Sequence, residues 1–277
     1  NMTVILDESL LKVRVYSITP GEVLNLGQRY GEFVKVQIDN VEEGLKPSIL
    51  EEEEEPAEEK EFGIITVGSG DGLKKLFLDY RADVVVTGGQ TMNPSTEDFV
   101  SAIKKVNARH IFILPNNSNI IMAAQQAASV SEGKDIIVLP TKSVPQGLAA
   151  CISFNPEGTV EENSADMKAA IEHVKTGSIT YAIKDTTVDG REIHAGDYMG
   201  ILEKDIVVTS KEKIEAACEL IKQMCDEDSE IVTLIRGEDA TDEEFEAIQK
   251  FIEENYEVDI DAEDGKQPVY SFIIGVE

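Results

Sequence analysis

Four short apolar runs, each followed by a polar loop and a helical pattern of apolar residues, constrain the fold of this chain most strongly. The runs cover residues 63–67, 84–87, 110–114 and 136–139. Runs of this length are typical of buried strands, and strands that alternate with helices form parallel sheets through right-handed crossovers. We therefore predict the fold class α/β, with a parallel-sheet lobe over residues 62–155.

The second run leads into a loop with more polar side chains than a turn requires. Gly88 and Gly89 allow a tight turn, and Ser95 can cap the following helix with Asp98 at the capping-box position. Three polar residues of the loop have no part in that local structure: Gln90, Thr91 and Asn93. Loops at the carboxyl ends of strands line the ligand crevice of open α/β sheets. This loop is therefore the first candidate for a functional site.

Two similar loops follow the third and fourth runs. Asn116 and Asn117 come after the third run, and Gln146 comes after the fourth. Because the carboxyl ends of parallel strands meet at one edge of the sheet, we expect the three loops to form one polar surface. The candidate binding residues are then Gln90, Thr91, Asn93, Asn116, Asn117 and Gln146. The alternative is that these side chains only cap helices and fill turns, as Asn117 could.

No complete pattern for catalysis or metal binding is found. The glycine-rich stretch 68–72 precedes a helix, but it lacks the G-x-x-x-x-G-K-[ST] pattern, and Asp71 would repel a phosphate. None of His110, His173 and His194 has a second histidine or a cysteine two to four residues away, as a structural zinc site would usually show, and no serine lies in a nucleophile-elbow sequence. We expect no catalytic residue, metal or cofactor in this chain.

The sequence outside the first lobe divides into three parts. Residues 1–45 have a β-α-β pattern, with a helix from Pro20 and a second strand over 33–38, and are too few to bury much apolar surface. They should expose an apolar patch that a partner or an upstream segment would cover. Residues 46–61 form an acidic linker. Residues 156–277 form a second, α+β lobe with a mixed sheet.

Two local signals support the assignment of this second lobe. Asp189 and Gly190 form a dipeptide that is typical of a β-hairpin turn. Thr241 with Glu244 has the spacing of a capping box before a helix.

Composition limits the cell compartment and the kind of partner. The formal net charge is −29, from 25 basic and 54 acidic residues, which argues against nucleic acid as a partner. No apolar run approaches membrane-spanning length, and the cysteines Cys151, Cys218 and Cys225 show no C-x-x-C spacing. These features predict a cytoplasmic protein with reduced thiols.

Three stretches, in order along the chain, resemble a known family. They are GGQTMNPST at 88–96, LPNNSNI at 114–120 and TKSVPQGLAA at 141–150. They are similar to the region after the kinase domain in dihydroxyacetone-kinase-like proteins, the ATP-binding subunits of bacterial fatty acid kinase. Residues 11–31 resemble the end of the middle domain of that family, so the resemblance covers nearly the whole chain.

The resemblance implies a division of labour between domains. Family members carry an N-terminal kinase domain that binds ATP and magnesium, a middle domain that forms a homodimer, and a C-terminal region with a DegV-like fold. The C-terminal region engages a fatty-acid-binding DegV-type protein, whose acyl carboxylate is phosphorylated to acyl phosphate for phospholipid synthesis. The chain lacks the kinase domain, so the resemblance implies a docking module without kinase activity of its own, with the six candidate residues at the docking edge.

One departure from the family pattern concerns a metal in the middle domain. Many relatives have a His-x-His pair where this chain has Arg14-Val15-Tyr16, and arginine cannot serve as a zinc ligand. This departure leaves open whether that metal site survives here.

Two alternatives to docking stay open. DegV-like relatives bind fatty acids, so the crevice itself could hold a fatty acid or another small anion. A long acyl chain needs a deep apolar tunnel, whereas a flat or closed surface favours docking. The second alternative is a dimerising scaffold formed by residues 1–45.

Overall fold

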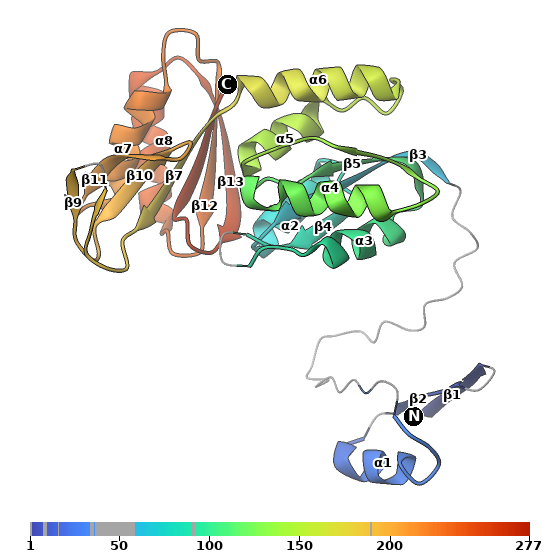
Figure 1. The fold of residues 1–277 in the computed structure, drawn as a ribbon. Coiled ribbons are helices and arrows are strands. Elements are labelled where there is room, and N and C mark those ends of the chain that lie inside the picture. Colours follow the sequence, from blue (N-terminus) through green and yellow to red (C-terminus); the bar gives the residue numbers. More distant parts are fainter. Residues whose placement is uncertain are drawn as a thin grey trace. The chain divides into compact units, whose positions relative to one another are not determined.

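The structure, a computed structural model, describes residues 2–7, 10–15, 17–33, 36, 59–89, 92–188 and 190–277. Internal contacts divide the chain into two compact units, Asn1–Glu55 and Pro56–Glu277. Figure 1 shows the ribbon of both units.

The N-terminal unit contains an antiparallel hairpin and one helix. Strand β1 (Met2–Asp7) pairs with β2 (Leu10–Val15), and helix α1 (Pro20–Gly27) has Pro20 in its first turn, as predicted. The sequence patterns had not predicted β1. Of the strand predicted over 33–38, only Phe33 and Val36 lie within the described residues, and neither is in a strand.

This unit leaves apolar side chains exposed. Helix α1 contains no buried residue. Large apolar side chains are exposed along β2, the helix and the segments on either side of the helix: Val13, Val15, Ile18, Leu26, Tyr30, Phe33 and Val36. The exposed patch agrees with the expectation that so short a segment cannot bury its own apolar surface.

The first sheet of the larger unit has four parallel strands in the order β4-β3-β5-β6. These strands are β3 (Lys60–Gly68), β4 (Val84–Thr87), β5 (Ala108–Leu114) and β6 (Asp135–Val138). All four correspond to the apolar runs of the sequence, and the parallel arrangement predicted for them is confirmed.

Helices cover both faces of this sheet (Figure 1). On one face lie α3 (Thr96–Lys105) and α4 (Ile121–Val130), the latter preceded by the 3₁₀ helix η1 (Ser118–Ile120). On the other face lie α2 (Asp71–Asp79), α5 (Val144–Ser153) and α6 (Val160–His173). Because α2 follows β3 and α4 follows β5 on the opposite face, the topological switch point lies between these two neighbouring strands.

The second sheet has six strands in the order β11-β10-β7-β14-β12-β13. It is mixed, as predicted, because β12 and β13 are parallel while the other pairs are antiparallel. Its strands are β7 (Lys175–Tyr181), β10 (Tyr198–Leu202), β11 (Asp205–Ser210), β12 (Ile231–Gly237), β13 (Asp259–Gln267) and β14 (Phe272–Val276).

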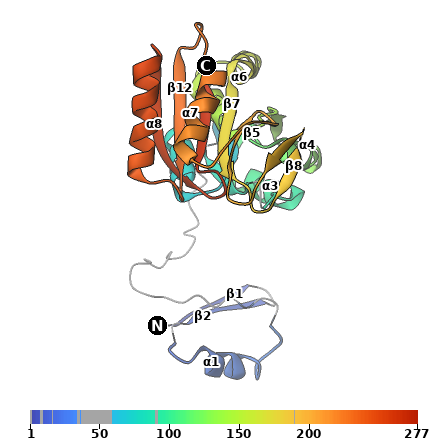
Figure 2. The ribbon, with the colours of Figure 1, turned by 90° about the vertical axis from the view of Figure 1, so that its left-hand side faces the viewer.

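Two helices cover one face of the second sheet. They are α7 (Lys213–Met224) and α8 (Asp242–Asn255); in Figure 2, α7 lies in front of the strands and α8 stands beside β12. The predicted hairpin around Gly190 is present as β8 (Thr186–Val188) paired with β9 (Arg191–Ile193). We call the first sheet with α2 to α6 the first lobe, and the second sheet with its two helices the second lobe.

Two predicted helix starts have the expected caps. Ser95 and Asp98 form a capping box at α3, and Thr241 and Glu244 form one at α8. Hydrogen bonds from the hydroxyl and the backbone N–H of Ser95 lower the pKa of the Asp98 carboxyl. The sequence patterns therefore located these helix starts correctly.

The two lobes share a hydrophobic core. Ile235 and Ile273 of the second sheet belong to the same buried cluster as Phe77 and Leu148 of the first lobe. Helix α6 lies beyond residue 155 in sequence but packs on α5 and contributes Met167 to this cluster. The separation of a lobe 62–155 from a lobe 156–277 stays a prediction, since Pro56–Glu277 forms one compact unit.

Close contacts hold the two lobes together along the surface where they meet, which we call the seam. A Cβ on Gly72 of α2 would overlap the backbone oxygen of Asp264 in β13. A Cβ on Gly275 of β14 would lie 2.7 Å from Cβ of Pro145 in α5. Close to that second contact, the hydroxyl oxygens of Ser143 and Thr176 lie 2.7 Å apart. The lobes therefore interlock at two separate places.

Within the described ranges, none of the helices combines the length and the apolarity that crossing a bilayer requires.

We expect Gly72→Ala to destabilise the larger unit by about 1–3 kcal/mol, because its methyl group has no space unless α2 moves off β13. The free energy of unfolding in urea would measure this loss. Gly68→Ala is the matched control, since a Cβ there lies 3.6 Å from Phe77, an ordinary contact distance. Equal losses for both variants would contradict the close packing of α2 on β13.

Candidate functional site

Of the candidate residues from the sequence, Asn93 follows β4, Asn116 and Asn117 follow β5, and Gln146, which was expected in a loop, lies in the first turn of α5. Gln90 and Thr91 are outside the described residues. Asn93 is exposed, whereas Asn116, Asn117 and Gln146 are only 8%, 7% and 8% exposed. The expected single polar surface is therefore incomplete, because three of its amide side chains are buried. The role of the six residues in docking stays a prediction.

The loop after β4 folds back on the sheet and exposes its far end. Gly88 N donates to Gly68 O at 3.2 Å, and Gly89 N donates to Met92 O at 3.0 Å. Gly88 allows this fold because a Cβ there would overlap the ring of Pro94. Met92 is 68% exposed, an unusual state for a methionine. The loop thus presents Met92 and Asn93 to the outside.

Asn116 lies at the topological switch point, where it joins three strands. Its Nδ2 donates to Thr66 Oγ1 and to Val67 O of β3, both at 2.8 Å. Its backbone N–H donates to Thr141 Oγ1, just after β6, at 2.9 Å. Thr66 and Thr141 have no exposed surface. The amide of Asn116 therefore occupies the point at which a doubly wound sheet usually opens into a ligand crevice.

The conformation of Asn116 is also unusual. Its φ of 57° lies in the left-handed region, which asparagine tolerates better than most residues. Its Oδ1 is buried without a hydrogen-bond partner within the described residues, and a Cβ on Gly147 would overlap this oxygen. The oxygen thus lies against the first turn of α5, where the positive end of the helix dipole favours it.

The other two buried amides serve local structure. Asn117 Oδ1 accepts a hydrogen bond from Asn119 N at 2.9 Å and caps η1, while its Nδ2 lacks a partner within the described residues. Gln146 Oε1 accepts one from Lys142 N at 2.8 Å and so closes the loop before α5. For Asn117 and Gln146, these contacts are the helix-capping and turn contacts that were the alternative to a binding role.

A larger and a smaller cavity lie at the seam between the lobes, and the larger lies where both lobes contribute loops. It has a volume of about 770 Å³ and lies between the stretch Ser69–Asp71, the loop from β12 to α8, and the loop from β13 to β14. Its wall includes Arg236, whose Nε donates to Asp264 Oδ1 at 3.3 Å and whose guanidinium lies 5.2 Å from the Phe245 ring centre. A charged, polar lining of this kind does not suit an acyl chain.

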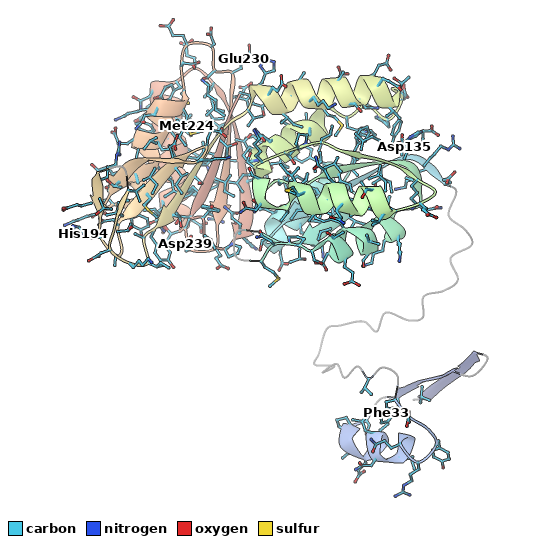
Figure 3. The ribbon with its side chains drawn as sticks, in the orientation of Figure 1. Phe33, Asp135, His194, Met224, Glu230 and Asp239 are labelled. Carbon is cyan, nitrogen blue, oxygen red and sulfur yellow. The ribbon has the colours of Figure 1, made fainter. Side chains whose placement is uncertain are left out.

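The loop from β12 to α8, which borders this cavity, is held by a buried lysine that the sequence patterns missed. Lys213 Nζ donates to Asp239 O at 2.8 Å and to Glu244 Oε2 at 3.0 Å. Ser271 Oγ donates to Asp239 Oδ2 at 2.7 Å, and the loop position of Asp239 can be followed in Figure 3. Arg236 could have been found from its place after the apolar run 231–235, whereas Lys213 has no such signal.

The smaller cavity, of about 300 Å³, also lies at the seam. Ala149, Ile152 and Ser153 of α5 face β12 and β13 across it, and three carboxylates contribute to its wall: Asp259, Asp261 and Glu277. Neither cavity is a deep apolar tunnel.

Nucleophiles and metal ligands do not gather in the described part of the chain. No group of three or more His, Cys, Asp or Glu side chains there could hold a metal ion. Burial raises the pKa of the Cys151 thiol to about 12, and burial together with Asp226 raises that of Cys225 to about 11. Both thiols are therefore protonated near neutral pH and are poor nucleophiles.

Two family models match the chain. Residues 63–277 match the C-terminal domain of the FakA-like fatty acid kinase proteins, and residues 1–47 match the middle domain of the same proteins. Together the two matches cover most of both compact units.

Curated relatives extend the match over the whole chain. Protein YloV of Bacillus subtilis is 48% identical over 284 residues, which is 100% of this chain and 51% of the relative. The uncharacterized protein SA1069 of Staphylococcus aureus is 40% identical over 282 residues, again 100% of this chain and 51% of the relative. The chain thus spans about half the length of the curated relatives it matches.

Solved structures show the fold. A DegV family protein from Ruminococcus gnavus matches with a TM-score of 0.56 at 14% identity, over 78% of this chain and 99% of that protein. A fatty-acid-binding DegV family protein from Thermus thermophilus gives 0.53 at 13% identity, over 78% and 99%. The dihydroxyacetone kinase of C. freundii gives 0.56 at 10% identity, over 79% of this chain and 48% of the kinase.

We expect Asn116→Ala to lower the free energy of unfolding by about 2–3 kcal/mol, because it leaves buried acceptors at Thr66 and Val67 without their donor. Asn93→Ala, at an exposed asparagine, should change it by no more than about 0.5 kcal/mol. Urea unfolding of both variants gives the comparison. A loss for Asn116→Ala as small as that for Asn93→Ala would show that the amide does not hold the strand ends together.

Proposed function

The chain belongs to the FakA-like family of fatty acid kinase proteins, and on this premise we propose that its C-terminal module docks the acyl-carrying partner of a fatty acid kinase. The partner is a fatty-acid-binding protein of the DegV type. Docking brings the acyl carboxylate of the partner to a kinase domain that is not part of this chain. That kinase domain phosphorylates the carboxylate to acyl phosphate for phospholipid synthesis. ATP and magnesium belong to that kinase domain, and this chain alone has no kinase activity.

The contrast between the filled switch point and the exposed neighbouring loop carries this proposal. Asn116 occupies the point where a small ligand would enter the sheet, and the lobes share a buried apolar core. Met92 and Asn93, in contrast, lie exposed at the same edge. An exposed, flexible methionine beside an amide suits contact with another protein surface better than enclosure of a small molecule.

A second candidate function is fatty acid binding by this module itself. One observation favours it: the face of the second sheet opposite α7 and α8 carries half-buried aliphatic side chains, among them Met199, Ile201 and Ile206. The polar, charged lining of the larger seam cavity does not suit an acyl chain, which weighs against it. We therefore rank docking first.

The N-terminal unit has a separate role in this proposal. Its exposed apolar side chains, such as Val13, Leu26 and Phe33, suit an interface within a homodimer of the full-length protein. Acyl phosphate synthesis from a cytosolic nucleotide would place the protein in the cytoplasm.

We expect the double variant Met92→Ala with Asn93→Ala to weaken binding of the acyl-loaded DegV-type protein by about tenfold or more, because both side chains are exposed at the proposed contact. The melting temperature should stay nearly unchanged. Calorimetric titration of the 277-residue chain with the loaded partner measures the affinity.

The matched control is Asn255→Ala, at an exposed amide at the end of α8 in the second lobe. It should bind the partner as the unaltered chain does. Unchanged binding of the double variant would remove the loop from the contact. Failure of the unaltered chain to bind the partner, together with uptake of free fatty acid, would move the second candidate to first place.

A further inference from the structure

The seam between the lobes brings like charges together. Helix α2 of the first lobe lies along the edge strand β13 of the second, where Gly265 faces the side chain of Leu73 and Gly72 lies against the backbone of Asp264. Because side chains alternate along a strand, Glu263 and Asp261 share this face with Gly265. Two carboxylates of the second lobe therefore point toward the first.

A third carboxylate belongs to the first lobe. Burial and the charge of Asp261 raise the pKa of Glu263; the like charge of Asp79, at the end of α2, raises it further, and the positive charge of Lys75 on the same helix lowers it. Burial, and then the charges of Asp261 and Glu263, raise the pKa of the phenol of Tyr80, which is next to Asp79 in sequence. Glu263 thus faces two carboxylates and one ammonium group at a half-buried position, where solvent screening is reduced.

The contacts around Glu263 leave little freedom to separate these charges. The overlap that a Cβ on Gly72 would make with Asp264 places α2 at van der Waals distance from β13. The shared core behind it, including Leu73, Phe77 and Ile235, holds both elements in place. Apolar packing therefore holds together a junction whose ionised side chains repel one another.

We propose that the junction of α2 with β13 is proton-sensitive, so that ionised Glu263 opposes the packing of the two lobes and protonated Glu263 permits it fully. The proposal is independent of the docking function. It assigns to Glu263 a conformational role that none of the sequence motifs indicated.

The direction of the titration supports this role. Burial, then the charges of Asp261 and Asp79, raise the pKa of Glu263, and Lys75 acts in the opposite direction. A carboxyl group with a higher pKa in the folded than in the unfolded state holds its proton more firmly when folded. Its contribution to stability is fully present below the unfolded pKa and is lost as the pH rises through the folded pKa.

The test is Glu263→Gln in the full chain, followed by urea unfolding from about pH 4 to about pH 7.5. Glutamine has the shape of the protonated side chain, so the variant should have a higher midpoint than the unaltered chain at neutral pH. The difference should vanish at the acid end of the range. Hydrogen exchange of α2 amides at neutral pH should slow in the variant, which locates the effect at the junction.

The matched control is Glu246→Gln on the exposed face of α8, which should show no pH-dependent difference in midpoint. Lys75→Gln supplies a second variant with the opposite sign: it should lower the midpoint at neutral pH and have less effect at acid pH. A midpoint of Glu263→Gln that is equal to or below that of the unaltered chain at neutral pH would overturn the proposal. So would a difference that is the same at both ends of the pH range.

Discussion

The amide of Asn116 is the interaction on which the first lobe depends. It joins β3 to β5 at the topological switch point, where the connection from β3 leads to β4 over one face of the sheet and the connection from β5 leads to β6 over the other. Doubly wound sheets usually open there into a binding crevice. Here the opening holds a side chain of the protein itself, and Gly147 leaves the space that this side chain needs.

A filled switch point changes what the DegV-like fold can do in this chain. A fold permits many functions, and the site decides among them. The lobes share one buried cluster and interlock at Gly72 and Gly275, so that apolar packing joins them. The loop with Met92 and Asn93 lies exposed on the outer surface. This geometry is the basis of the docking proposal.

The sequence predicted the sheets well because strand and helix periodicity depends on local order. The four parallel strands, the mixed second sheet and the capping boxes at Ser95 and Thr241 follow from spacing alone. Burial of loop residues does not follow from spacing. Asn93 and Asn116 occupy equivalent loops and have the same side chain, yet one is exposed and the other joins three strands. That difference arises from Thr66, fifty residues before Asn116 in the chain, and no local pattern contains it.

Hydrogen exchange of the full chain, measured alone, with free fatty acid and with the acyl-loaded DegV-type partner, tests the central claim most directly. The account predicts that the partner slows exchange over residues 88–95, while free fatty acid changes nothing in α5 or in the strands of the second sheet. Slower exchange of α5, β7 and β10 with free fatty acid alone would contradict it. The interior between the lobes would then be the binding site, and the outer loop would not.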